Sequence, residues 1–136
     1  MPTDETKRWM AVKPRIIAAA GDLPIAWPKA DFDPDGKAYL AVGRVKAEPQ
    51  RVTIRTQHRQ VWSLMMMLMT PLSDRQPVEV TDEQAGQIAG HFPVDLKLTY
   101  EWQAMRVTER PHVSEGFREG AWWQTPIRVR LEHLGT

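Results

Sequence analysis

The chain has 136 residues, 42% hydrophobic and 26% charged, which is typical of one folded domain, here residues 1–136, and excludes a disordered chain. Its net charge of only +1 predicts no bulk attraction to nucleic acid, so any basic surface has to be local. The absence of cysteine excludes disulfides, thiolate metal sites and cysteine nucleophiles.

The first residues predict an amphipathic helix from Asp4 to Ala20. Thr3 can cap this helix, Gly21 is a natural stop, and Pro14 should bend it. Apolar residues recur inside the segment at spacings of three and four, which is the period of a helix with one buried face. The N-terminus has no apolar core of a signal peptide, so we expect the protein to fold in a cytoplasm.

An irregular stretch should follow, from Leu23 to Gly36, because it contains three prolines. Residues 31–36 read Asp-Phe-Asp-Pro-Asp-Gly and resemble the start of a calcium-binding loop. The twelfth position of such a loop should be a glutamate, but here it is Val42, inside an expected strand. We therefore interpret the segment as an acidic turn, with calcium as the alternative.

Two-residue alternation predicts strands over Lys37–Glu48 and Arg51–Gln60. Arg51, Arg55 and Arg59 fall on one face of the second strand. This basic face is either an ordinary solvated surface or an electrostatic contact with DNA phosphates or with an acidic partner subunit.

Residues 61–69 form an apolar run that reads Val-Trp-Ser-Leu-Met-Met-Met-Leu-Met. The run is too short for a membrane-spanning helix, which needs ~20 apolar residues. We predict a strand, because the alternation of the preceding segment leads into it and Thr70-Pro71 closes it. Both faces of that strand are apolar, so both need a cover. Met65, Met67 and Met69 share one face and form either an ordinary core strand or a subunit interface.

The second half of the chain predicts a further helix and further strands. Thr81 and Gln84 have the spacing of a capping box, which predicts a helix from Asp82 to Phe92. The other expected elements are a loop over residues 71–80, two short strands or one bent strand over 96–108, a polar loop over 111–120 and a last strand over 121–134. This order predicts an α+β fold, with an antiparallel or mixed sheet of about 4–6 strands and two helices packed on one face. The other face of the central strand then needs a different cover.

No constellation of catalytic residues is evident. The histidines lack a metal-ligand spacing, no serine lies in a G-x-S-x-G elbow, and there is no Gly-rich phosphate loop. We therefore predict that the protein is not an enzyme and has no metal or cofactor. The alternative is a small enzyme or ligand-binding domain, which would need a deep pocket with convergent polar groups.

Several segments together resemble the tail-terminator or tail-completion proteins of long-tailed phages and related prophage elements. The resemblance is carried by Leu-Pro-Ile-Ala-Trp-Pro at 23–28, Phe32 and Pro34, Ala-Tyr-Leu-Ala-Val at 38–42, Gln-Val-Trp at 60–62, the helix Glu83 to Phe92 with Pro93, and Trp122-Trp123. Order and spacing agree over nearly the whole chain. The run of methionines departs from the pattern, since family members are usually less Met-rich there.

The resemblance implies a hexameric ring that caps the finished tail tube, ends its polymerisation and presents a docking surface to the head connector. The implied partners are other copies of the chain, the tail tube protein and head-tail connector proteins, with a possible non-specific DNA contact in the lumen. The implied location is the tail-head junction of a virion or phage-like particle, after assembly in the host cytoplasm. No catalytic residue, cofactor or membrane contact is implied. The alternative is another head-tail joining or tail-associated structural protein with the same fold.

Overall fold

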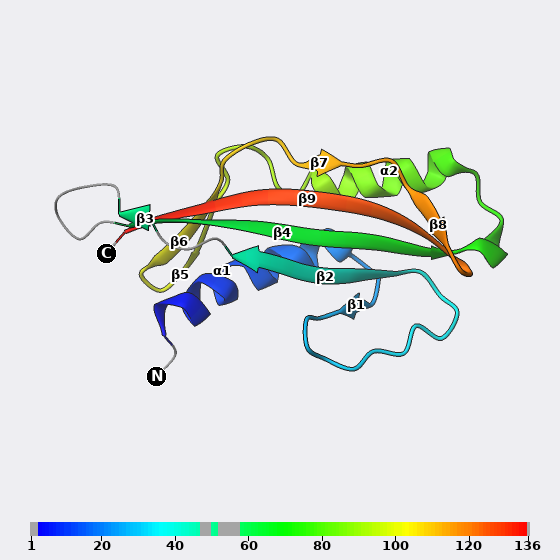
Figure 1. Ribbon diagram of the computed structural model, residues 1–136, viewed down its shortest axis with the longest axis horizontal. Coiled ribbons are helices and arrows are strands. Elements are labelled where there is room, and N and C mark those ends of the chain that lie inside the picture. The colour runs from blue at the N-terminus through cyan, green and yellow to red at the C-terminus, as the bar shows by residue number, and fades with distance from the viewer. Residues whose placement is uncertain (1–2, 47–49, 52–57, 136) are drawn as a thin grey trace.

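The computed structural model describes residues 3–46, 50–51 and 58–135, whose arrangement is shown in Figure 1. These residues form two α-helices, one short 3-10 helix and one sheet of nine strands. The helices are α1 (Asp4–Ala20), η1 (Leu72–Asp74) and α2 (Val78–Ala89). The strands are β1 (Ile25–Ala26), β2 (Tyr39–Lys46), β3 (Gln50–Arg51), β4 (His58–Pro71), β5 (Lys97–Tyr100), β6 (Gln103–Val107), β7 (His112–Val113), β8 (Phe117–Glu119) and β9 (Trp122–Gly135).

The two longest strands form the centre of the sheet. β4 and β9 pair antiparallel, from His58 opposite Gly135 to Pro71 opposite Trp122. The main path of the sheet runs β1-β2-β4-β9-β6-β5, while β3 pairs with β4, and β7 and β8 pair with β9. The β1–β2 pair is parallel, so the sheet is mixed. The predicted α+β class is confirmed, and the six strands of the main path match the upper end of the expected number.

The first helix has the predicted bounds. The Thr3 side chain accepts a hydrogen bond from the Thr6 backbone N–H at 3.3 Å, which satisfies one amide at the helix start. Pro14 lies inside α1 on its exposed side, and the helix continues past it to Gly21, whose φ of 59° ends it. Val12 and Ile16, on the other side of α1, are fully buried.

Both helices cover the same face of the sheet and lie behind it in the view of Figure 1. Four even-numbered residues in the middle of β4 face the helices and are at most 1% exposed: Trp62, Leu64, Met66 and Leu68. Ile127, Val129 and Leu131 of β9 join the same core. Burying one such side chain contributes roughly 1.5–3 kcal/mol, so this layer is the main source of stability.

The second helix begins one turn earlier than the capping box predicts. α2 starts at Val78 with Pro77 at the N-cap position, and it ends at Ala89 instead of Phe92. Thr81 is inside the first turns and only 5% exposed, so its side chain is buried and does not cap the helix start. The prediction was wrong because proline, with a fixed φ and no N–H to satisfy, can begin a helix without a capping side chain.

Three short strands lie in segments expected to be irregular. β1 lies in the stretch 23–36, and β7 and β8 lie in the expected loop 111–120. Strands of two or three residues show too little alternation to be read from sequence. The segment 96–108 forms two strands, β5 and β6, joined at Glu101, which has a φ of 51°. Most of the predicted strand 51–60 lies outside the described residues.

Candidate functional site

The sheet has a second face that neither helix covers, which we call the helix-free face. On β4 this face carries the odd-numbered residues, because alternate residues of a strand point to opposite sides. Val61, Ser63, Met65 and Met67 are partly exposed there, whereas the even-numbered residues between them are buried. The predicted strand is confirmed, and the described residues leave its odd-numbered face incompletely covered.

Small apolar residues flank the methionines on the helix-free face. Met65 lies opposite Gly43 and Met67 opposite Ala41 on β2. Pro126 of β9 lies opposite Met67 on the other side. Val45, further along β2 on the same face, is 62% exposed. These pairings place several apolar residues next to one another on the helix-free face.

Three aromatic rings close one end of the helix-free face. Phe32 packs on Tyr39 with ring centroids 4.7 Å apart, and Tyr39 meets Trp122 edge-on at 5.3 Å. Met69 lies opposite Tyr39 in the β2–β4 ladder and is only 8% exposed. Met69 is therefore already buried within the chain, while Met65 and Met67 remain accessible to a partner.

Strand β9 adds basic residues to the helix-free face. Arg128 lies opposite Met65 and Arg130 opposite Ser63, and both arginines are exposed. No ion pair between described residues involves either of them. The helix-free face therefore combines an apolar centre on β2 and β4 with two guanidinium groups on β9.

The predicted basic face is only partly described. Arg59 lies on the helix-free face and pairs with Glu132, with 3.1 Å from Nε to Oε2. Arg51 lies on β3 opposite His58, and Arg55 lies outside the described residues. A shared contact face of Arg51, Arg55 and Arg59 therefore stays a prediction.

Arg128 and Arg130 were not among the residues predicted from the sequence, although the structure places them on the helix-free face. The sequence does carry a signal for them. Arg128 and Arg130 alternate with the apolar Ile127, Val129 and Leu131, which predicts one polar face of a strand, as for the basic face predicted around Arg55. The structure adds what the alternation lacks, namely that these arginines share a face with the methionines of β4.

Contacts within the chain occupy the edge between α1 and β2. The Arg44 guanidinium lies 4.5 Å from the ring centroid of Trp9 and 5.5 Å from that of Trp62. Lys46 lies 5.6 Å from the Trp62 ring and pairs with Glu5 at 2.8 Å. The hydrogen bond from Lys46 lowers the pKa of Glu5. These cations are engaged with aromatic rings and a carboxylate of their own chain.

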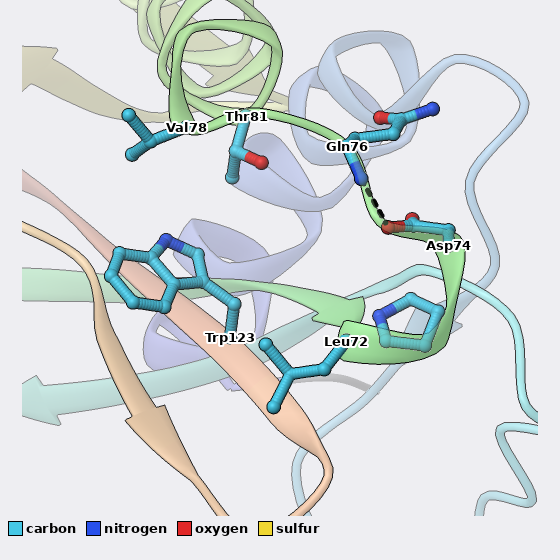
Figure 2. A pocket seen from close by; sticks show the side chains of 7 residues that line it. Leu72, Asp74, Gln76, Val78, Thr81 and Trp123 are labelled. Carbon is cyan, nitrogen blue, oxygen red and sulfur yellow. Dashed lines mark hydrogen bonds between the residues drawn. The ribbon is translucent and has the colours of Figure 1, made fainter.

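A small pocket lies at the start of α2, as Figure 2 shows. Its volume is 190 Å³, and its lining residues are Pro71, Leu72, Asp74, Gln76, Val78, Thr81 and Trp123. Ligand sites usually measure about 300–1,000 Å³. Asp74 accepts a hydrogen bond from the Gln76 backbone N–H at 3.2 Å, so its carboxylate serves the local turn. The Trp123 Nε1 is buried without a hydrogen-bond partner among the described atoms. The lining offers no pairing of a nucleophile with a base.

A second hollow, of 450 Å³, lies beside the end of α2. Its lining is apolar or glycine apart from Arg110: Gly86, Ala89, Gly90, Phe92, Pro93, Val94, Pro111 and Val113. Such a lining lacks the convergent polar groups of a catalytic pocket.

The part of the chain that the structure describes contains no group of three His, Cys, Asp or Glu residues placed to hold a metal ion. In the acidic segment 31–36, the Asp35 backbone N–H donates a hydrogen bond to Oδ1 of Asp33 at 3.1 Å, which is the ordinary bonding of a turn.

None of the described helices is long and apolar enough to cross a membrane.

A family model of phage tail terminator proteins matches residues 8–131. The chain belongs to the phage tail terminator family. The resemblance seen in the sequence is thus confirmed. This tail terminator family member is a tail-associated structural protein, and it works with other tail or head components.

Two solved structures share the fold of this tail terminator family member. One, whose name gives no function, is 20% identical, has a TM-score of 0.67, and the match covers 97% of this chain and 93% of that chain. The other is a chain from the virion of a native gene transfer agent (GTA) particle, 10% identical, with a TM-score of 0.58 and 96% and 94% coverage. A search of curated proteins found no match.

Proposed function

We propose that this protein assembles as a hexameric ring that caps the finished tail tube, ends its polymerisation and joins it to the head connector. The helix-free face is the observation that carries the proposal. It leaves Met65 and Met67 partly exposed and Val45 largely exposed to water in a single copy. Covering each such side chain contributes up to roughly 1.5–3 kcal/mol, which favours association.

Within the ring, we assign the subunit interface to the surface around Met65 and Met67, with Met69 at its buried end. Arg51, Arg55 and Arg59 are proposed to contact DNA in the lumen or an acidic partner. Membership of the tail terminator family supports a place at the end of the tail tube. The fold shared with a chain of the gene transfer agent virion is consistent with a place in such a particle.

The proposal is tested by removing the gene from the particle-producing element and measuring tail length by electron microscopy. We expect tubes longer than normal and no joined heads, because nothing stops polymerisation. Restoring the gene in trans should restore tails of uniform length. Tails of normal length without the protein would contradict a terminator role.

Imaging of intact particles separates this role from that of another head-tail joining component. A ring of this protein directly on the last tube ring supports a terminator. A position on the head side of a different terminator ring supports the alternative. Absence from both tails and particles would contradict either role.

A further inference from the structure

The outer face of α2 is acidic and has no basic residue. Glu79, Asp82 and Glu83 are exposed, and Asp82 and Glu83 follow Glu79 by three and four positions, so both lie on the side of the helix that carries Glu79. The helix dipole favours Glu79 in the first turn but does not account for Glu83, one turn further on. No ion pair between residues of known placement involves these three carboxylates. We call this surface the acidic face of α2.

The acidic face of α2 continues into an exposed glycine that the fold does not require. Gly86 follows Asp82 and Glu83 by one turn, and a Cβ added there would meet nothing within 4 Å. Glycine inside a helix costs roughly 0.5–1 kcal/mol relative to alanine. Its benefit is that another backbone or side chain can approach the helix closely.

The acidic face of α2 and the helix-free face complement each other. One carries carboxylates beside a glycine, and the other carries Arg128 and Arg130 beside the partly exposed Met65. The two surfaces lie on opposite sides of the sheet, because α2 packs on the side that bears the buried residues of β4. One copy can therefore use both surfaces at once.

We propose that the acidic face of α2 in one copy packs on the helix-free face of the next copy. Asp82 and Glu83 then face Arg128 and Arg130 across the contact, while Gly86 lets the methionine surface approach α2. Such a head-to-tail contact repeats from copy to copy and closes into a ring if the rotation permits. The inference rests on the proposed ring and adds the surfaces that form it.

A second copy fits the helix-free face better than DNA does. Phosphates would pair with Arg128 and Arg130 but would leave the methionines beside them in water. A symmetric dimer through the helix-free face would set arginine against arginine, which is unfavourable. The acidic face of α2 supplies opposite charge and an approachable backbone together.

Charge reversal tests the contact. We would prepare an arginine-reversed chain (R128E and R130E), an acid-reversed chain (D82K and E83K) and a chain with all four changes. Assembly is followed by native mass spectrometry and sedimentation at low salt, alone and with isolated tail tubes. Each reversed chain should associate with itself about tenfold or more weakly, or roughly 1.4 kcal/mol. The chain with all four changes should regain assembly.

Mixing the two reversed chains gives a further readout. The acid-reversed chain has both surfaces basic and the arginine-reversed chain has both acidic, so the chains should assemble only together and in alternation. Matched controls are K29E with K37E and D22K with D31K, which change exposed loop residues and should assemble as the wild type does. Circular dichroism and urea unfolding verify that each chain is folded.

Cysteine cross-linking provides a measurement that does not depend on charge. The wild-type chain has no cysteine, so a short bismaleimide reacts only at introduced thiols. A chain with S63C and G86C should form a ladder of covalent multimers. Either single variant should give dimers at most.

The outcomes separate this inference from the proposed function. If the wild type assembles and the reversed chains do so equally well, the contact is overturned while the ring stands. If the folded chain with all four changes does not regain assembly, the charge pairing is also overturned. If reversing Arg128 and Arg130 abolishes only DNA retention, the helix-free face meets DNA instead. A wild type that never associates, alone or on tubes, overturns both the ring and the contact.

Discussion

Arg8 of α1 donates a hydrogen bond from Nη1 to Oε1 of Gln60 at 2.8 Å, which ties the first helix to the central strand. The Nε of Arg8 also donates to Oε1 of Gln103 at 3.0 Å, so one guanidinium joins α1, β4 and β6. Gln60 is only 6% exposed. Burial lowers the pKa of Arg8, as expected for a cation held partly out of water.

Replacing Arg8 by methionine should destabilise the fold by about 1–3 kcal/mol, because the buried Gln60 amide loses its hydrogen-bond donor. Urea unfolding followed by circular dichroism measures the change. Arg118→Met is a matched control, since Arg118 is exposed and a surface change usually stays within ~0.5 kcal/mol. Equal stability of the Arg8 and Arg118 variants would show that the network contributes nothing.

Replacing Gly86 by alanine should stabilise the isolated fold by roughly 0.5–1 kcal/mol, because the helix gains propensity and the new methyl group has space. Gly90→Ala is the comparison. A Cβ at position 90 would meet backbone oxygens at 3.4 and 3.5 Å, so this variant should gain less stability. Thermal unfolding measures the stability of both variants. A destabilised Gly86→Ala variant would contradict the open surroundings of this position.

Replacing Gly116 by alanine should destabilise the fold by about 1–3 kcal/mol. A Cβ at this position would lie 2.3 Å from Nε1 of Trp123, so the rigid indole or the backbone has to shift. Urea unfolding together with tryptophan fluorescence tests the effect. A neutral substitution would mean that the indole relaxes into the neighbouring pocket at no cost.

The Glu5–Lys46 ion pair should give stability that depends on pH. The pKa of Glu5 is lowered in the folded state from a reference of 4.5, so the pair contributes fully above that value and is lost as the pH falls through the folded-state pKa. The Glu5 side chain is 47% exposed, which limits the contribution to about 0–1 kcal/mol.

Comparing Glu5→Gln with the wild type by urea unfolding tests this contribution. The variant should be slightly less stable at pH 7, and the difference should vanish at strongly acidic pH and shrink in high salt. Glu115→Gln is the control, because Glu115 is exposed and forms no ion pair with the described residues. A difference that grows on acidification would contradict the sign of the effect.

Long elements with a regular pattern of apolar residues were predictable from the sequence. The helix period of residues 4–20 and the apolar run 61–69 identified α1 and the core of β4. The doubly apolar strand also indicated that one face would need a cover other than helices. The structure identifies that face as the one bearing Met65 and Met67.

Other features depend on tertiary pairing and were not predictable. Thr81 occupies the sequence position expected of a cap, but α2 begins earlier, after Pro77, and the Thr81 side chain is buried in the lining of the pocket. Arg128 and Arg130 lie beside Met65 and Ser63 only because β9 pairs with β4 along its full length. Met69 differs from Met65 because the rings of Tyr39 and its neighbours lie at that end.

We propose that this protein works by packing against copies of itself at the end of a tail tube. Native mass spectrometry of wild-type protein released intact from isolated tails measures the number of copies directly. We expect a closed ring of six copies that dissociates when the charges of Arg128 and Arg130 are reversed. Single copies on the tails, or tails without this protein, would contradict it.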